Sequence, residues 1–540
     1  MLGLVLSLLA GVHASSQPDL CLPGVAGHAS SEQTCTDTED SALLQLHGHH
    51  ATFRGDPMSI EELNTSIEGV VQAVPSSWTG VDNGWNASIA NTYYWTQPPG
   101  MFKCNRPSYT VTVKSVADIP KALRFARENK MTVSVKNHGH SYFGGGYGGE
   151  LLIYMSELTL TNVQEGRTYC TTQHDSIEVG GGSTFLDVYK VILDNFTMVG
   201  GACPSVGAGG GWTLGNGMSN EALPMYGLGI DEVLQYDIFL ANGSHVQANE
   251  CSYPELFKAL RGGGGGFGVI TAVHYKLHPP TPLQNYEWTS CNGNSSDPSN
   301  PNTTKRWDLL IRWAGKWDKR WSTKYISCAA IYTFLGTHEE AEASEFYQDA
   351  TSTFGLPVHT SWKSVIDFKL GDLGGSNWDW TLQDSTSRQL SKTFQGNWRI
   401  PLDYLIDKPE EARDTFINMS ASGAWCPFHG EYLLLGKNNE ITESDDPTAV
   451  HPATRRAAFQ VTVCDKSNME TLMTMFPGSG QGINHAAPFL QDFQHQLWGP
   501  RYPFVLSVKK SVDPHGLFQC FQCVGSELVA PATTVASHDS

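Results

Sequence analysis

The sequence predicts an α+β protein, from two kinds of periodicity and a surplus of glycine. Tyr109–Val113 alternates polar and apolar residues as a strand does, while Ala122, Leu123 and Ala126 form one face of a helix. Of 540 residues, 54 are glycine and 16% are charged, against averages of about 7% glycine and about 25% charge. At about 150 residues per domain, this length predicts roughly two to four structural units.

Residues 1–14 are predicted to be a signal peptide, because the apolar run Met1–Gly11 precedes small residues of the kind that signal peptidase cleaves after. The polar, aperiodic segment 15–75 is expected to be a flexible arm, so order should begin near Trp78. Asn-x-Ser/Thr sequons and twelve cysteines fit a secreted, disulfide-bonded glycoprotein. No later run reaches about 18 apolar residues, so no membrane span is expected.

A first domain is predicted over 76–280, and it begins with a βαβ unit. A capping box at Ser115–Asp118 starts the helix, and Met131–Val135 is the second strand. Further elements follow in this order: strands at Leu151–Met155 and Ser176–Val179, a helix at Phe185–Leu193, and a hairpin of Val233–Leu240 with His245–Ala248 turned at Asn242-Gly243.

A second domain is predicted over 281–480, where tryptophans become dense. It is expected to contain a strand at Tyr325–Leu335 and a helix around His338–Ser352. Residues 481–527 form a closing segment with one more helix, and 528–540 form a polar tail.

The charge balance excludes some partners. Lys and Arg number 35 against 54 Asp and Glu, a net charge of −19 with no basic stripe. This argues against nucleic acid and anionic membranes as partners. We expect a monomer that binds a small molecule.

Two G-x-G-x-x-G stretches fail the test for a dinucleotide-binding Rossmann turn, which needs a strand before the glycines and a helix after them. Gly263–Gly268 follows a predicted helix, Glu255–Leu260, and precedes a predicted strand, Val269–Val273. Gly144–Gly149 runs into another strand. A nicotinamide-binding Rossmann domain is therefore disfavoured, and no P-loop motif is present.

Three glycine-rich segments need a different explanation: 136–146, 200–217 and 261–271. Bare backbone lets N–H groups approach a phosphate or a flat ring closely. The segments contain Gly-His-Ser at 139–141, Cys-Pro-Ser-Val-Gly at 203–207, and Arg-Gly-Gly-Gly-Gly-Gly-Phe-Gly-Val-Ile-Thr at 261–271.

In order and spacing these motifs resemble the vanillyl-alcohol-oxidase-type FAD-linked oxidoreductases, and among them the berberine-bridge-enzyme-like oxidases. The C-terminal Trp498–Phe518 is similar too, so the likeness covers about 109–527. The resemblance implies a two-part PCMH-type FAD-binding domain and an α+β substrate-binding domain with an antiparallel sheet. Residues 481–527 would return to the FAD domain.

The resemblance makes His140 the attachment point for the 8α-methyl of FAD and Cys203 the attachment point for C6, a bicovalent linkage. An imidazole and a thiolate are nucleophiles that can add to an electron-poor flavin. Without that context, His140 would be an ordinary loop histidine and Cys203 half of a disulfide. The same resemblance implies a larger set of FAD-contacting positions: Asn137, His138, Gly139, Ser141, Gly207, Gly209, Gly210, Gly211, Gly217, Gly266, Gly268, Val269 and Ile270.

The chain departs from the family pattern at two places. His138 stands where family members carry glycine; a metal-binding His138-x-His140 pair is disfavoured, because no third ligand has a typical spacing, and Cys520-x-x-Cys523 is interpreted as a disulfide. Gly482 occupies the position of the tyrosine that helps deprotonate the substrate in oligosaccharide oxidases, two residues before Asn484.

The catalytic base must therefore come from elsewhere. His485 follows Asn484, and Glu431 lies on an expected strand of the second domain; each could instead make an ordinary structural hydrogen bond. Val206 resembles the small residue that admits O₂ to the flavin in oxygen-using members.

These features together predict a secreted FAD-dependent oxidase of an alcohol or sugar hemiacetal that gives H₂O₂, with the tryptophans of the second domain as stacking faces. Three alternatives remain: oxidative cyclisation of a secondary metabolite, a flavin dehydrogenase, and a glycoprotein that binds ligand without turnover.

Overall fold

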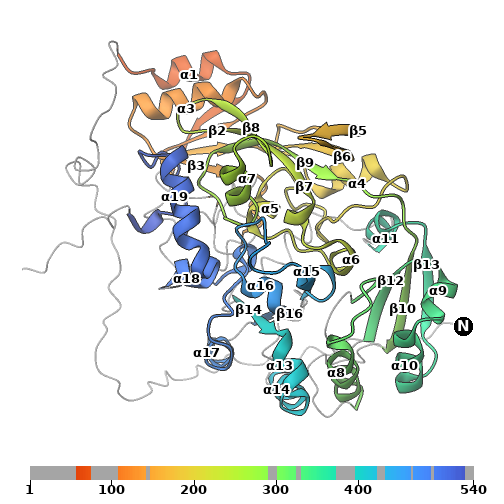
Figure 1. Cartoon of the computed structure of the whole chain (residues 1–540). Helices are drawn as coiled ribbons and strands as arrows, with labels where there is room; N and C mark the ends of the chain where they lie inside the picture. Colours follow the sequence, from red (N-terminus) through yellow and green to blue (C-terminus); the bar gives the residue numbers. More distant parts are fainter. Residues whose placement is uncertain are drawn as a thin grey trace, which may run out of the picture. The chain divides into compact units, whose positions relative to one another are not determined.

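The computed structural model describes residues 56–74, 107–141, 146, 148–289, 301–323, 330–372, 396–421, 432–463, 466–487, 490 and 492–528. Figure 1 shows their helices and strands, coloured along the chain.

A four-stranded sheet opens the described chain, in the order β1-β2-β4-β3. Its strands are β1 (Val70–Ala73), β2 (Tyr109–Thr112), β3 (Val133–Lys136) and β4 (Leu151–Tyr154). β2, β4 and β3 are parallel, and helix α3 (Asp118–Glu128) connects β2 to β3. The predicted βαβ unit is confirmed, with α3 burying Ile119, Leu123 and Ala126 in its core.

The prediction that order begins near Trp78 is wrong. Helix α1 (Ile60–Ser66) starts at a capping box of Ser59 and Glu62, and β1 pairs with β2 in antiparallel register. The buried Asp118 carboxylate accepts a hydrogen bond from the Glu68 backbone N–H at 2.8 Å, which ties this segment to α3. The sequence Val70-Val-Gln-Ala73 does not alternate polar and apolar residues, so the order of this strand comes from pairing with β2, which the sequence does not display.

A five-stranded antiparallel sheet follows, in the order β5-β6-β9-β7-β8. The β7–β8 hairpin confirms the predicted one. The elements of this region are β5 (Thr161–Tyr169), β6 (Thr172–Gly180), α4 (Phe185–Ile192), α5 (Gly211–Gly215), α6 (Leu223–Tyr226), η3 (Gly229–Glu232), β7 (Val233–Phe239), β8 (His245–Ala248), α7 (Pro254–Leu260) and β9 (Val269–Lys276).

The next region contains two antiparallel sheets, ordered β11-β12-β10-β13 and β14-β16-β15. The expected helix around 338–352 is two helices, and Ser344 caps the second of them. The elements are β10 (Leu283–Thr289), α8 (Pro301–Ala314), β11 (Trp321–Thr323), β12 (Ala330–Leu335), α9 (His338–Glu342), α10 (Glu345–Phe354), β13 (Val358–Trp362), α11 (Val365–Asp372), β14 (Gly396–Pro401), α13 (Leu402–Asp407), α14 (Pro409–Ala421), β15 (Tyr432–Leu433), α15 (Lys437–Glu440), α16 (Ala453–Arg456), β16 (Ala457–Val463) and α17 (Lys466–Met475).

Four tryptophans of this region lie in its core, which corrects for these four the expectation that they offer stacking faces. Trp307 and Trp321 are fully buried, and Trp288 and Trp313 nearly so, in one cluster with Tyr286. Each large ring removes more apolar area from water inside the core than it could on a binding surface.

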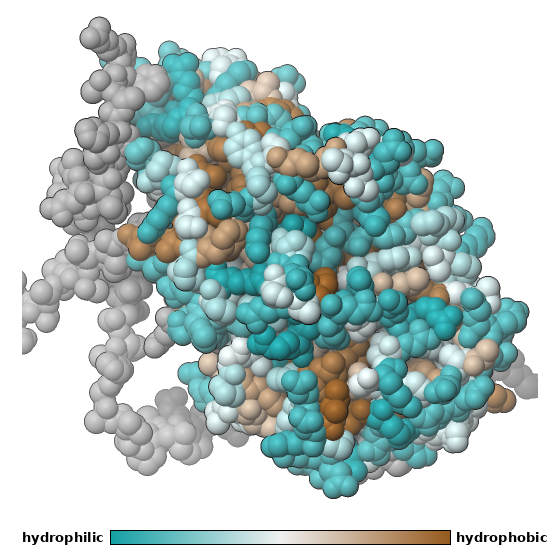
Figure 2. Space-filling model, viewed as in Figure 1, coloured by the Kyte–Doolittle hydropathy of each residue, from teal (hydrophilic) through white to brown (hydrophobic). Residues whose placement is uncertain are grey.

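Short helices close the described chain: η4 (Ile483–His485), α18 (Phe493–Trp498), η5 (Gly499–Arg501), α19 (Tyr502–Val512) and η6 (Ser526–Leu528). The single helix expected here is thus α18 and α19. No described helix is long and apolar enough to cross a membrane. On the face drawn in Figure 2, hydrophilic side chains cover most of the described surface, and hydrophobic ones show in narrow strips between them.

Candidate active site

The three glycine-rich segments line one cavity together with side chains from the second region and the closing segment. The first wall comes from 136–141, 201–218 and 264–265. Facing residues come from β15, β16 and the segment around η4. Along the turn 264–268 a second cavity continues from the first and shares Gly211, Leu214, Gly264 and Gly265 with it.

His140 and Cys203 both line the first cavity. The Nε2 atom of His140 lies 3.1 Å from Ser205 Oγ, two residues beyond Cys203, so the loop after β3 meets the segment before α5. Cys203 is the free cysteine among the described residues. Burial raises the pKa of its thiol, and the nearby Lys369 ammonium offsets part of that effect.

His138, at a position where the resemblance implies glycine, fastens the loop to the second sheet. His138 Nε2 donates to the Gly182 carbonyl at 2.7 Å, and the Asn137 amide donates to the Gly181 carbonyl. A Cβ at Gly209 would lie 1.9 Å from the Gly180 carbonyl oxygen, so only glycine permits this approach.

Most predicted FAD-contacting residues meet at these cavities. The first is lined by Asn137, His138, Gly139, His140, Ser141, Cys203, Gly207 and Gly211, and the second by Gly209, Gly210, Gly266, Gly268 and Ile270. Gly217 and Val269 line neither. Gly217 provides a left-handed turn at φ 68°, and Val269 is a core residue at the start of β9.

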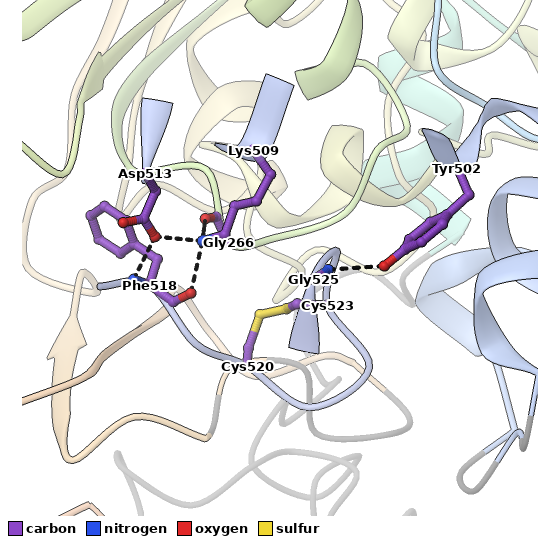
Figure 3. Close-up of a disulfide and its surroundings, with 8 residues drawn as sticks. All are labelled: Gly266, Tyr502, Lys509, Asp513, Phe518, Cys520, Cys523 and Gly525. Atoms are coloured by element: carbon purple, nitrogen blue, oxygen red, sulfur yellow. Dashed lines mark hydrogen bonds and ion pairs between the residues drawn. A yellow bond between two sulfur atoms is a disulfide. The ribbon is translucent and has the colours of Figure 1, made fainter. Parts of the chain in front are cut away.

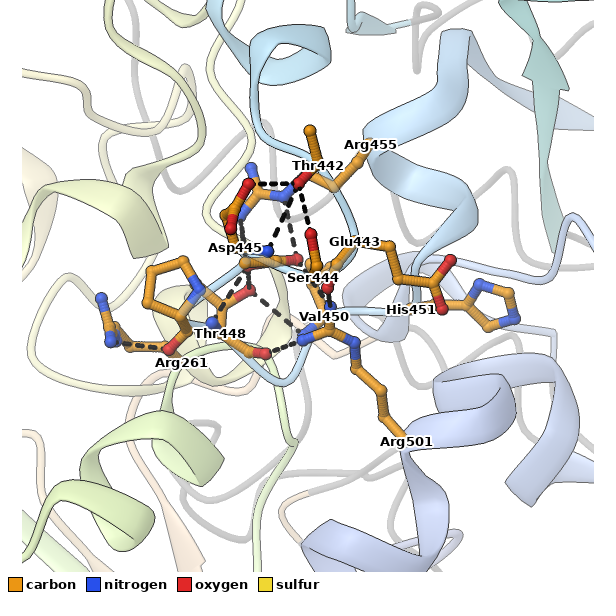
Figure 4. Close-up of polar contacts among 12 residues, drawn as sticks. Arg261, Thr442, Glu443, Ser444, Asp445, Thr448, Val450, His451, Arg455 and Arg501 are labelled. Atoms are coloured by element: carbon orange, nitrogen blue, oxygen red, sulfur yellow. Dashed lines mark hydrogen bonds and ion pairs between the residues drawn. The ribbon is translucent and has the colours of Figure 1, made fainter.

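Arg261, the first residue of the third segment, lines neither cavity. Its guanidinium donates to the Pro447 carbonyl at 2.7 Å (Figure 4). The Arg261 carbonyl accepts a hydrogen bond from Ala449 N–H. Beside it the buried Arg455 pairs with Asp231 and Asp446 at 2.7 and 3.1 Å. Burial alone would lower the pKa of Arg455, but the two carboxylates raise it. The hydrogen bonds of Arg261 join the glycine turn to the loop before β16, and the ion pairs of Arg455 join η3 to the same loop.

The wall of the first cavity opposite the glycine-rich segments is formed mainly by side chains. His485 is half-buried in η4, and its ring stacks on Tyr432 with centroids 5.6 Å apart. The Asn484 amide donates to the Trp212 carbonyl at 3.2 Å, which fastens η4 to α5.

Gln460 closes the space beside Gly482, the position at which the resemblance implies a tyrosine. A Cβ at Gly482 would lie 2.3 Å from Gln460 Oε1, so a larger residue at 482 would collide with this amide. Gln460 is fully buried, lines the cavity, and has no hydrogen-bond partner for either amide atom among the described residues. An unpaired buried amide in a cavity wall is suited to bind a polar ligand.

Sequence reasoning missed Tyr432, Gln460 and Lys136. The first two lie in β15 and β16, which pair Tyr432 with Gln460, and no motif marks them. Burial lowers the pKa of Lys136 to about 7. Val206 lines the cavity beside Cys203, whereas Glu431 lies outside the described residues.

The two histidines of 138–140 turn to different partners, Gly182 and Ser205, and do not converge. One cluster of Glu178, Asp237 and His274 has metal-ligand atoms within 4.8 Å of one another. Protein groups already bond two of its members: Gln235 donates to Asp237 at 2.7 Å, and the Tyr169 hydroxyl lies 3.0 Å from His274 Nδ1. We assign it no metal.

The cavities suit FAD on structural grounds. The second cavity is walled by consecutive glycines at 209–211 and 264–266, which leave backbone exposed for a phosphate-bearing chain. The first cavity places a histidine and a free thiol in one lining. Comparisons with known proteins agree. The family model described as FAD binding domain matches residues 107–249.

Among curated proteins, the chain is 28% identical to the FAD-linked oxidoreductase ffsJ of Aspergillus flavipes, over 93% of this chain and 87% of that protein. Among solved structures, it resembles the VAO-type flavoprotein MtVAO615 from Myceliophthora thermophila C1, with a TM-score of 0.63, 24% identity, and coverage of 78% of this chain and 80% of that one. It also resembles glucooligosaccharide oxidase from Acremonium strictum, with a TM-score of 0.63, 19% identity, and coverage of 84% and 97%. These matches confirm the predicted fold class. The chain is an FAD-linked oxidoreductase with the fold of the vanillyl-alcohol-oxidase-type and berberine-bridge-enzyme-like flavoproteins.

Proposed function

We propose that this protein is a secreted oxidase that removes a hydride from the carbon of an alcohol or sugar hemiacetal and gives H₂O₂. The observation that carries the proposal is the pairing of two unlike walls around one cavity: a glycine backbone wall with His140 and Cys203, and a side-chain wall with His485, Tyr432 and Gln460. Bound FAD supplies the hydride acceptor and returns electrons to O₂.

Attachment of FAD through both His140 and Cys203 is part of this proposal. The glucooligosaccharide oxidase of Acremonium strictum carries a 6-S-cysteinyl, 8α-N1-histidyl FAD. In the present chain the segment of His140 meets the segment of Cys203 at the contact between His140 and Ser205. Cys203 forms no disulfide with another described residue. A cofactor held at two points needs fewer enclosing contacts, which leaves the side-chain wall free to receive substrate.

We assign proton removal to His485. Its imidazole lines the cavity, and the Tyr432 ring stacked on it at 13° between planes fixes the orientation of the imidazole. A general base must lie within hydrogen-bond reach of the substrate hydroxyl, and a neutral imidazole can accept that proton near neutral pH. Gln460 beside it would hold a second polar group of the substrate.

Export to an oxidising compartment remains a prediction. Two disulfides among the described residues, Cys170–Cys251 and Cys520–Cys523, support it. A chain purified from culture medium should begin after residue 14.

The test is peroxide release from the purified flavoprotein against a panel of sugars and primary and secondary alcohols. Peroxide formed in step with oxidised product supports the proposal. Flavin reduction by substrate without peroxide would make the protein a dehydrogenase, and a ring-closed product would make it a cyclising oxidase. Ligand binding without flavin reduction would identify a non-catalytic binding protein.

A further inference from the structure

The Cys520–Cys523 disulfide lies where the two cavities meet. Cys523 and its neighbour Gln522 line the first cavity, which holds His140 and Cys203, and Cys520 lines the second. Both cysteines are buried, with exposed fractions of 8% and 6%. The cavity walls, not the outer surface, are therefore where a reaction partner can meet this pair.

A glycine brings the cavity turn directly against the two sulfurs. A Cβ at Gly265 would lie 3.3 Å from Cys520 Sγ and 3.7 Å from Cys523 Sγ. Gly265 lines both cavities, so one bare residue separates the disulfide from the proposed FAD path.

The surroundings hold the two cysteines together whether or not the S–S bond exists. Cys523 N–H donates to the Cys520 carbonyl at 3.2 Å, which closes a tight turn. The buried Lys509 ammonium donates to the Gly266 carbonyl at 2.6 Å and to the Phe518 carbonyl at 2.9 Å, and it pairs with Asp513 (Figure 3). These contacts tie the cysteine segment to the glycine turn. A dithiol formed here would stay in place to close again.

We propose that Cys520 and Cys523 are a second redox group of this active site, which exchanges two electrons with the FAD. In one direction the S–S bond breaks, each sulfur gains one electron and one proton, and reduced FAD supplies both electrons and both protons and becomes oxidised. In the other direction the dithiol closes and FAD is reduced. The inference rests on FAD occupying the proposed cavity, but not on the identity of the alcohol.

The chain contains a matched control. Cys170–Cys251 joins the β5–β6 turn to the segment before α7; Cys251 is exposed, and neither cysteine lines the two cavities. Electrons that reach a disulfide through the FAD should reduce Cys520–Cys523 in preference to Cys170–Cys251.

The experiment uses the full-length holoprotein. It is reduced with dithionite without oxygen, passed through an anaerobic desalting column, and treated with one addition of excess dichlorophenolindophenol. Samples before and after the dye are alkylated with N-ethylmaleimide, and the cysteine peptides are identified by mass spectrometry. We expect Cys520 and Cys523 to be labelled before the dye and unlabelled after it. The dye should take up about two two-electron equivalents per FAD, and about one in a Cys520→Ser/Cys523→Ser variant.

The labelling of the unsubstituted chain decides the question even where the double variant does not fold. The inference is overturned if the FAD is reduced but N-ethylmaleimide does not label Cys520 and Cys523 in the sample taken before the dye. It is also overturned by cysteines that stay labelled after the dye, or that close no faster than Cys170 and Cys251. Protein that purifies without FAD contradicts the proposed function instead, and the two failures are therefore distinct.

Discussion

The two walls of the first cavity differ in chemical composition, since one is mainly backbone and the other is mainly side chains. The wall proposed for FAD is backbone: glycines at 207, 209–211 and 264–266, with a few fixed side chains among them. The facing wall is made of side chains from β15, β16 and η4, which are brought together by sheet pairing and by the contact of Asn484 with Trp212. A cofactor shared across a family can be recognised by backbone, whereas the substrate of one enzyme is selected by side chains. Substitutions on the backbone wall should therefore affect the flavin, and substitutions on the side-chain wall should affect the reaction with substrate.

The largest effect is expected from His485→Gln, which keeps a polar side chain but removes the base. Flavin reduction by substrate should slow by about 10²–10⁴-fold, with the flavin still attached. In the parent enzyme the same rate should fall as pH drops below neutrality, because a protonated imidazole accepts no proton. Stopped-flow reduction over a pH series measures both.

Tyr432→Phe is the matched control, because it keeps the ring stacked on His485 and removes only the hydroxyl. Its reduction rate should stay near that of the parent. If Tyr432→Phe reduces its flavin much more slowly than the parent while His485→Gln reduces it at the parent rate, the catalytic base is Tyr432 and not His485.

Gln460→Leu should separate substrate binding from stability. Loss of one neutral hydrogen bond should raise KM by roughly 2- to 10-fold with kcat nearly unchanged. Because neither amide atom has a partner among the described residues, the free energy of unfolding should rise by about 1 kcal/mol. Steady-state kinetics and urea unfolding test the two halves, and a destabilised variant with normal KM would make Gln460 a structural residue.

Val206→Leu adds bulk to the FAD wall beside Cys203. Reoxidation of reduced flavin by O₂ should slow, while reduction by substrate stays nearly unchanged, since the substrate binds at the opposite wall. Stopped-flow traces of the two half-reactions measure this, and equal reoxidation rates would exclude a gate at this position.

The smallest effect concerns His451, which lies in the loop joined to Arg261. Burial lowers the pKa of this histidine well below its usual range, so the folded protein keeps it neutral. The unfolded chain takes up the proton first as pH falls below about 6.5, and stability drops by at most about 1.4 kcal/mol per pH unit. Urea unfolding at pH 7 and pH 5 should show a smaller drop for His451→Gln. An identical drop would assign the acid sensitivity to other groups.

The sequence predicted the FAD wall better than the facing wall for a physical reason. The glycines at 261–268 determine the shape of one local turn, so their spacing in the sequence is enough to recognise it. The helix before this turn and the strand after it were both predictable from periodicity. The partnership of Tyr432, Gln460 and His485 arises from the pairing of β15 with β16 and from the approach of η4, and no local pattern encodes such contacts. The same limit applies to β1, which is ordered by pairing with its neighbour β2. It also applies to Trp288, Trp307, Trp313 and Trp321, which were predicted as stacking faces and are core residues.

The most direct test of the account is to locate the flavin. The protein should stay yellow after acid precipitation, and proteolysis should yield one cross-linked species in which FAD joins the His140 peptide to the Cys203 peptide. Cys203→Ala should retain the single link through His140, whereas His140→Ala should leave any FAD removable. Colourless protein with free FAD in the supernatant, or FAD attached to a residue outside this cavity, would contradict the assignment of the backbone wall to the flavin.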